Sequence, residues 1–182
     1  HLPPLSAGLF GYIGYDMVSY FENIKIKNND SLNLPETILM RPSLICIFDR
    51  LKDEFILITP VRAKKDISAL DAWENGKNIL SNAVNDLNVG LEHRNLPVQK
   101  DTMLDNNAPS NLEKLDFYNS VERAKEYIKS GDIYQVVLSQ RFEIPFKKSS
   151  ISFYRSLRRL NPSPFLFHFN FKDFFVVGSS PE

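Results

Sequence analysis

The polar residues best suited to chemistry gather in one stretch, Gly131–Phe142, which reads Gly-Asp-Ile-Tyr-Gln-Val-Val-Leu-Ser-Gln-Arg-Phe. Its composition predicts a β-strand, along which side chains alternate between two faces. Gln135, Ser139 and Arg141 then share one face, and their amide, hydroxyl and guanidinium groups could form the floor of a cleft for a small anion. An antiparallel strand with one solvent-exposed face would show the same pattern, so spacing alone leaves both interpretations open.

The elements around this stretch are predicted from caps, breakers and periodicity. Helices are expected over 66–87 with Asp66 as N-cap, over 116–130 ended by Gly131, and from Ser149 or Ser150 to Leu160, with a short helical turn over 16–21 capped by Asp16. Strands are expected over 38–48 and 54–61 as a hairpin, with Pro42 at an edge or bulge, and over 165–171 and 174–177 around a turn. Hairpins interspersed with helices favour the α+β class over a doubly wound parallel sheet.

The aromatic segment over residues 7–15 contains three glycines, at positions 8, 11 and 14. Glycines within a strand mark bends or a close approach of two backbones. Their spacing differs from the Gly-x-Gly-x-x-Gly fingerprint, so no nucleotide-binding loop is predicted.

The overall charge is typical neither of a nucleic-acid binder nor of a protein that binds anionic membranes. The chain has 182 residues, with 22 Lys plus Arg and 22 Asp plus Glu, so no net field would gather polyanions. No apolar run approaches the length of a membrane span. The one cysteine, Cys46, is expected in the core, and the lack of an internal disulfide suits the cytoplasm. No His or Cys cluster has metal-site spacing, so no metal site is expected within this chain.

Four stretches, in order, resemble the chorismate-utilising enzymes, and among them the anthranilate-forming branch. They are Gly11–Asp16 (Gly-Tyr-Ile-Gly-Tyr-Asp), Gly131–Phe142, Asn161–Phe165 (Asn-Pro-Ser-Pro-Phe) and Gly178–Glu182 (Gly-Ser-Ser-Pro-Glu). The resemblance implies a partial chorismate-utilising fold, with antiparallel sheets packed face to face and helices outside. Residues 1–182 would be a fragment of one larger chorismate-binding domain, with an irregular linker at 87–114 between 1–87 and 115–182.

The same resemblance implies a lyase reaction of tryptophan biosynthesis. These enzymes add a nucleophile to carbon 2 of chorismate and expel the hydroxyl at carbon 4, and the anthranilate-forming branch then eliminates pyruvate. Mg²⁺ holds the substrate carboxylate, and a glutamine amidotransferase subunit (component II) delivers ammonia. The Mg²⁺ ligands are expected outside this chain, which alone is expected to be inactive.

Two catalytic positions carry over from the resemblance, Gln135 and Glu182. Relatives that add water have lysine where this chain has Gln135, because water needs a base to remove its proton. Ammonia already has a free lone pair, so an amide that orients it by hydrogen bonding suffices. Glu182 corresponds to the general acid that protonates the departing hydroxyl, which requires a raised pKa. A solvent-exposed strand residue and a solvated glutamate remain the alternatives.

The Asn-Pro-Ser-Pro loop resembles half of the family's tryptophan feedback site. The positions that carry over as inhibitor-binding are Asn161, Ser163, Pro164, Phe165 and Leu166. Relatives usually have Tyr and Met where this chain has Phe and Leu, so the pocket stays apolar and loses a hydroxyl. The other half-site, a Leu-Leu-Glu-Ser run, is not found in this chain, so it is expected to bind tryptophan weakly or not at all. A helix stop followed by a strand would also explain the prolines.

Two rival functions remain open from sequence. The aminase component of 4-amino-4-deoxychorismate synthase adds ammonia to chorismate at a different carbon and does not eliminate pyruvate. A stand-alone amino-acid-binding regulatory module would have the tryptophan loop without catalysis. Gln135 and the Asn-Pro-Ser-Pro loop favour the anthranilate-forming branch.

Overall fold

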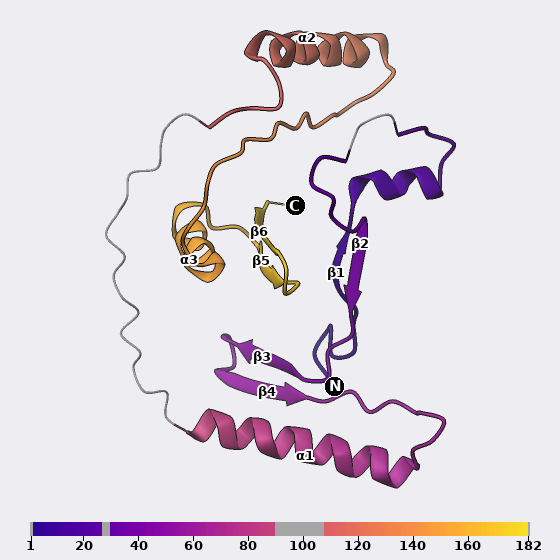
Figure 1. The fold of residues 1–182 in the computed structure, drawn as a ribbon, viewed down its shortest axis with the longest axis vertical. Helices are drawn as coiled ribbons and strands as arrows, with labels where there is room; N and C mark the ends of the chain where they lie inside the picture. Colours follow the sequence, from indigo (N-terminus) through magenta and orange to yellow (C-terminus); the bar gives the residue numbers. More distant parts are fainter. Residues whose placement is uncertain (1, 27–29, 90–107, 182) are drawn as a thin grey trace. The chain divides into compact units, whose positions relative to one another are not determined.

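The computed structural model describes residues 2–26, 30–89 and 108–181, which divide into two compact units, 1–96 and 97–182 (Figure 1). The elements in chain order are β1 (Phe10–Ile13), the 3₁₀-helix η1 (Tyr15–Tyr20), β2 (Thr37–Met40), β3 (Ile45–Asp49), β4 (Glu54–Ile58), α1 (Ala69–Asn88), α2 (Lys114–Ser130), α3 (Ser150–Leu160), β5 (Phe165–Asn170) and β6 (Phe175–Ser180). Within the described residues the strands form three antiparallel pairs, β1–β2, β3–β4 and β5–β6. The predicted α+β class with antiparallel pairing is confirmed.

The glycine-rich segment forms β1 because two glycines let it approach β2. Gly11 has a φ of 154°, and a Cβ placed on it would overlap the carbonyl oxygen of Ile38 and lie 2.9 Å from its carbonyl carbon. Gly14 donates from its backbone N–H to the carbonyl of Glu36 at 2.7 Å, so it too is held against the facing chain. The predicted close approach of two backbones is confirmed here.

The predicted strand over 38–48 is divided into two strands that pair with different partners. β2 pairs with β1, whereas β3 pairs with β4 in a register that runs from Ile45 opposite Ile58 to Asp49 opposite Glu54. Pro42 lies between β2 and β3, and it has no N–H to donate to a ladder. Ile45 is buried, whereas its neighbour Cys46 is exposed, because adjacent residues of a strand point to opposite faces. The prediction that Cys46 lies in the core is therefore wrong.

Both predicted aspartate N-caps are also wrong. η1 begins at Tyr15, so Asp16 lies inside its first turn, and Gly14 is the N-cap. α1 is capped by Ser68, whose hydroxyl accepts a hydrogen bond from the Asp71 N–H at 3.1 Å. Asp66 stays outside the helix because the backbone turns between residues 64 and 67 first.

α1 packs on β4, and Figure 1 shows it lying along the β3–β4 hairpin. Gly76 is buried in the middle of the helix, and a Cβ there would lie 2.9 Å from Cγ2 of Val61. The larger apolar side chains at Leu70 and Trp73 are 66% and 60% exposed. Gly76 weakens the helix as an isolated segment, but its small size lets α1 approach Thr59 and Val61, which follow β4.

In the second unit, caps and turns follow the sequence predictions. Gly131 ends α2 in the left-handed conformation at φ 84°, and Ser149 caps α3 by accepting from the Ser152 N–H at 3.2 Å. β5 and β6 form the predicted hairpin, with Lys172 in the turn at φ 74°. α3 packs on this hairpin. Most of the predicted linker over 87–114 lies outside the described residues, although α1 ends at residue 88 and α2 begins at residue 114.

The predicted strand over Gly131–Phe142 is not formed. The segment is extended coil apart from a single bridge between Phe142 and Ser110. A strand requires a facing backbone that completes its hydrogen bonds. None of the described residues pairs with residues 134–139, so β-favouring side chains alone do not make a ladder there.

Candidate functional site

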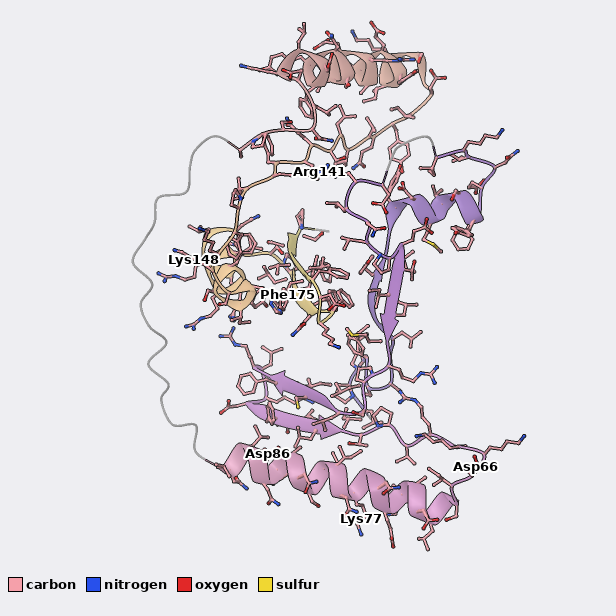
Figure 2. All side chains as sticks on the ribbon, in the orientation of Figure 1. Asp66, Lys77, Asp86, Arg141, Lys148 and Phe175 are labelled. Atoms are coloured by element: carbon pink, nitrogen blue, oxygen red, sulfur yellow. The ribbon has the colours of Figure 1, made fainter. Side chains whose placement is uncertain are left out.

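Gln135 lies in a segment that is fastened at both ends and unpaired between them. At its start, the N–H of Asp132 donates to the carbonyl of Tyr127 at 3.0 Å. At its end, the N–H of Arg141 (labelled in Figure 2) donates to Oδ1 of Asn111 at 2.8 Å. The side chain of Gln135 is exposed and makes no hydrogen bond to any described residue. Its amide is therefore available to a ligand and is not held in a closed apolar core.

The Asn-Pro-Ser-Pro loop is tied to both neighbouring elements. Asn161 is the C-cap of α3, and its N–H donates to the carbonyl of Leu157 at 2.8 Å. The hydroxyl of Ser179, near the end of β6, donates to the Asn161 carbonyl at 2.7 Å. Ser163 is half-buried, and its Oγ finds no hydrogen-bond partner among the described residues. A buried hydroxyl without a partner carries a desolvation cost that a ligand could offset.

Phe165 and Leu166 point to opposite faces of the hairpin. His168 lies within hydrogen-bond distance of Ser150 in α3, with 2.9 Å between Nε2 and Oγ, so its face of β5 is the one that α3 covers. Leu166, two residues earlier, shares that face and is half-buried. Phe165 lies on the other face with 58% of its surface exposed. A ligand beside the loop thus has Phe165 on one side of the sheet and Leu166 on the other.

The motif that ends in Glu182 lies along β6 next to this loop, although Glu182 itself is outside the described residues. Ser180 pairs with Phe165, which places the end of β6 at the beginning of β5. Gly178 pairs with Phe167, whose ring lies over the glycine: a Cβ at 178 would be 2.7 and 2.8 Å from the two Cε atoms. The structure therefore brings two of the predicted motifs together, at one end of the hairpin.

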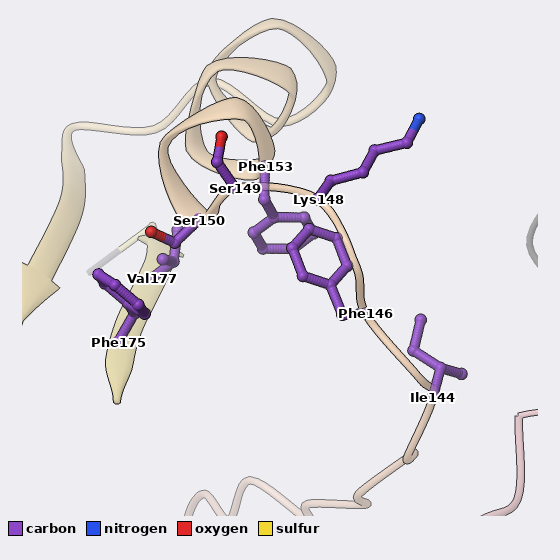
Figure 3. Close-up of a pocket in the computed structure, with 8 residues that line it drawn as sticks. All are labelled: Ile144, Phe146, Lys148, Ser149, Ser150, Phe153, Phe175 and Val177. Carbon is purple, nitrogen blue, oxygen red and sulfur yellow. The ribbon is translucent and has the colours of Figure 1, made fainter. Parts of the chain in front are cut away.

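A cavity of about 640 Å³ lies at the other end of α3 from the Asn-Pro-Ser-Pro loop, against the N-terminal turn of that helix (Figure 3). Its walls are mostly apolar, and the rings of Phe146 and Phe153 meet edge to face at 5.6 Å. Phe175 and Val177 of β6 complete one side. None of the site residues predicted from sequence lines this cavity. Its aromatic residues come from three separate segments, so no local pattern could have revealed it.

The described residues contain no group of three or more His, Cys, Asp or Glu side chains that could hold a metal ion. On α2, a hydrogen bond from Lys125 and the charge of that lysine lower the pKa of the Glu122 carboxyl. No helix in the described ranges is long and apolar enough to cross a membrane.

Comparison with known proteins places the whole chain within one family. Residues 1–182 match the sequence profile described as chorismate binding enzyme. The chain is 42% identical to "Anthranilate synthase component 1" of Cereibacter sphaeroides and 37% identical to that of Aquifex aeolicus, covering 100% of this chain in each case. It spans 36% of the length of these relatives.

A solved structure agrees in fold with this chain. The crystal structure of anthranilate synthase component I from Streptococcus pneumoniae matches with a TM-score of 0.75 at 28% identity, over 100% of this chain and 40% of that one.

Proposed function

Because this chain belongs to the family of chorismate binding enzymes, we propose that it is part of an anthranilate synthase component I. The complete enzyme would convert chorismate and ammonia into anthranilate, pyruvate and water, a carbon–oxygen lyase reaction of tryptophan biosynthesis. Relatives named anthranilate synthase component 1 in several species support this product over aminodeoxychorismate and over a non-catalytic regulatory module. The chain matches about a third of those proteins, so it would not catalyse the reaction alone.

In this proposal Gln135 orients the nucleophile. Ammonia attacks carbon 2 of chorismate with its lone pair, and the ring electrons shift as the hydroxyl leaves carbon 4. An amide side chain can accept a hydrogen bond from ammonia and hold the lone pair toward the ring without removing a proton. The observation that carries this assignment is the exposed, unbonded amide of Gln135, in a segment anchored at both ends.

Glu182 is proposed as the acid that protonates the hydroxyl, so that it departs as water. The intermediate then loses a proton from carbon 2 and its enolpyruvyl group as pyruvate, which leaves the aromatic ring of anthranilate. A carboxylic acid stays protonated near neutral pH when desolvation or a nearby negative charge raises its pKa. Support for this role is the position of the motif, since β6 leads toward residue 182 beside the beginning of β5.

We also propose a partial tryptophan site at the loop and the beginning of β5. The unpartnered hydroxyl of Ser163 and the exposed ring of Phe165 support it, since a buried donor and an aromatic surface suit an amino acid with an indole ring. Asn161, Pro164 and Leu166 would complete it. Its contacts lie on both faces of the hairpin, so further chain is needed to enclose the ligand.

The proposal extends to a partner and to Mg²⁺ outside this chain. A component 1 implies a second component, and a glutamine amidotransferase subunit would supply ammonia. Mg²⁺ would be held by residues beyond this segment. The single free cysteine fits action in the cytoplasm.

The role of Gln135 is tested in the complete enzyme, with ammonium salts as the nitrogen source so that no amidotransferase is needed. Gln135→Ala is expected to lower kcat for anthranilate by about 10- to 100-fold, because small losses of alignment at the reacting atoms are costly. Gln140→Ala is the matched control. That glutamine lies in the same segment, but its Nε2 donates to Oγ of Ser110 at 2.7 Å.

Gln140→Ala is expected to leave the ammonia-dependent kcat within about twofold, because its amide is already bonded within the protein. Equal losses in both variants would mean that the segment matters only for structure. Full activity of Gln135→Ala would remove the orienting role while leaving membership of the family unaffected.

A further inference from the structure

A second cavity, of about 210 Å³, lies in the first unit between α1 and the chain that follows β4. The polar side chains along it include Thr59, Arg62, Lys64 and Asn75, while Gly76 forms part of its α1 side. Ordinary pockets for drug-sized ligands occupy roughly 300–1,000 Å³, so this cavity suits a smaller molecule or one end of a larger one.

Thr59 brings an unused hydrogen-bonding group to the cavity. Its Oγ1 is buried, and it finds no hydrogen-bond partner among the described residues. Its methyl group faces the helix, since a Cβ on Gly76 would lie 3.7 Å from Cγ2 of Thr59. Buried hydroxyls are normally bonded, so an unbonded one at a cavity wall indicates a missing partner.

Two cations at the same cavity have no carboxylate partner in the part of the chain that the structure describes. Within the described ranges, neither Arg62 nor Lys64 has an acidic oxygen within 4.0 Å. Arg62 is half-buried, and its one hydrogen bond to a described residue is a long one, from Nη1 to the carbonyl of Pro42 at 3.4 Å. A partly buried guanidinium attracts anions more strongly than an exposed one, because the local dielectric constant is lower.

The nearest acidic residues in sequence do not neutralise this charge. Asp66 follows the two lysines at 64 and 65 but does not line the cavity, and Figure 2 shows it near the N-terminal end of α1. Asp71 accepts a hydrogen bond from the Ser68 hydroxyl at 2.6 Å, as part of the N-terminal cap of α1. The cavity therefore combines positive charge, a spare hydroxyl and an amide.

We propose that this cavity binds a phosphate-sized oxyanion. The guanidinium of Arg62 and the ammonium of Lys64 would bind the negative charge, and the hydroxyl of Thr59 would donate to one oxygen. Planar guanidinium groups suit phosphate particularly well, since two N–H groups can bond two oxygens at once. This site lies in the first unit, and nothing in the proposed chemistry of Gln135 and Glu182 requires it.

The test measures thermal unfolding of the complete protein in inorganic phosphate and in chloride at matched ionic strength. A ligand that binds the native state raises the unfolding midpoint as its concentration passes its Kd. Wild type is expected to be stabilised by phosphate beyond chloride. Lys64→Gln is expected to raise the Kd for phosphate about fivefold or more. The neighbouring variant Lys65→Gln, an exposed lysine that does not line the cavity, is expected to leave it unchanged.

Thr59→Val separates stability from phosphate binding, because it is expected to raise the first and weaken the second. Without phosphate it is expected to raise the unfolding midpoint, because the unbonded hydroxyl is gone. Its Kd for phosphate is expected to be several-fold weaker than that of wild type. The proposal is overturned if phosphate and chloride stabilise wild type equally, or if Lys64→Gln and Lys65→Gln weaken phosphate binding alike. The measurement follows binding rather than turnover, so it is independent of the proposed enzyme activity.

Discussion

Replacing Gly178 by alanine should destabilise the β5–β6 hairpin, because the new methyl group would displace the ring of Phe167. The backbone at Gly178 does not have a positive φ, so alanine is not strained there. The new Cβ would, however, lie 2.7 and 2.8 Å from the two Cε atoms of Phe167, where ordinary contacts are 3.4–4 Å. The ring of Phe167 must therefore leave its place over the strand.

The size of the destabilisation follows from the burial and the aromatic contact that the ring of Phe167 loses. Phe167 is half-buried and its centroid lies 5.6 Å from that of Phe169. Half of a phenylalanine's burial contributes about 1 kcal/mol, and an aromatic pair adds roughly 0.5–1.5 kcal/mol. Alanine recovers about 0.5–1 kcal/mol over glycine in a strand, because it restricts the unfolded chain. Gly178→Ala should therefore destabilise the hairpin by about 1 kcal/mol.

The sign should reverse when the ring is absent. In a Phe167→Ala background, Gly178→Ala is expected to stabilise the hairpin by about 0.5 kcal/mol, since only the backbone effect remains. In a Phe169→Ala background, the ring of Phe167 keeps its burial but loses the aromatic pair, so the cost of Gly178→Ala should fall to about 0–0.5 kcal/mol without reversing its sign. Native-state hydrogen exchange of the β5 and β6 amides in the complete protein measures these local free energies of opening.

An unchanged cost of Gly178→Ala in the absence of the Phe167 ring would refute this reasoning. It would mean that the backbone of β6, rather than the ring, requires glycine at the start of the Gly-Ser-Ser-Pro-Glu motif.

Gly11→Ala is expected to open the β1–β2 pair at a cost of about 3 kcal/mol or more, because alanine has both an unfavourable φ and a clash with the Ile38 backbone. Gly8→Ala, which meets only ordinary contacts from 3.7 Å, should change the exchange of the same amides by less than about 1 kcal/mol. A hydrogen bond from Lys125 and the charge of that lysine hold the pKa of Glu122 below its ordinary value of 4.5. The ion pair therefore stabilises the folded state at pH values above 4.5, and this stabilisation is lost as the pH falls through the lowered pKa. Lys125→Met should raise the Glu122 pKa in an NMR titration, and an unchanged value would exclude the pair as the cause.

The second unit shows how far local signals determine structure. Gly131 ends α2 because glycine adopts the left-handed conformation at little cost. Ser149 begins α3 because its hydroxyl accepts a hydrogen bond from an N–H group of the first turn. Both were predictable from a few neighbouring residues. Residues 131–142 show where such signals stop, since β-favouring side chains do not supply the facing backbone that a strand requires.

The candidate site was likewise predictable from the sequence only in part. The amide at Gln135 and the Asn-Pro-Ser-Pro loop were found from their residue types and from resemblance. The sequence did not show which of Phe165 and Leu166 is covered, because this depends on α3 packing on the face of the hairpin that carries His168. The paired cations near α1 gave no sequence signal, because the residues around them come from separate segments.

Sequence by itself determined the family, the end of α2 at Gly131, the Ser149 cap of α3 and the turn of the β5–β6 hairpin, since each depends on residue identities or on the conformational preferences of a few adjacent residues. Only the tertiary structure decided which face of each helix and strand is covered. Amphipathic α1, for example, packs Gly76 against Thr59 and Val61, which follow β4, and leaves Trp73 exposed. Close backbone approach and shape decide that choice, and both depend on segments far away along the chain.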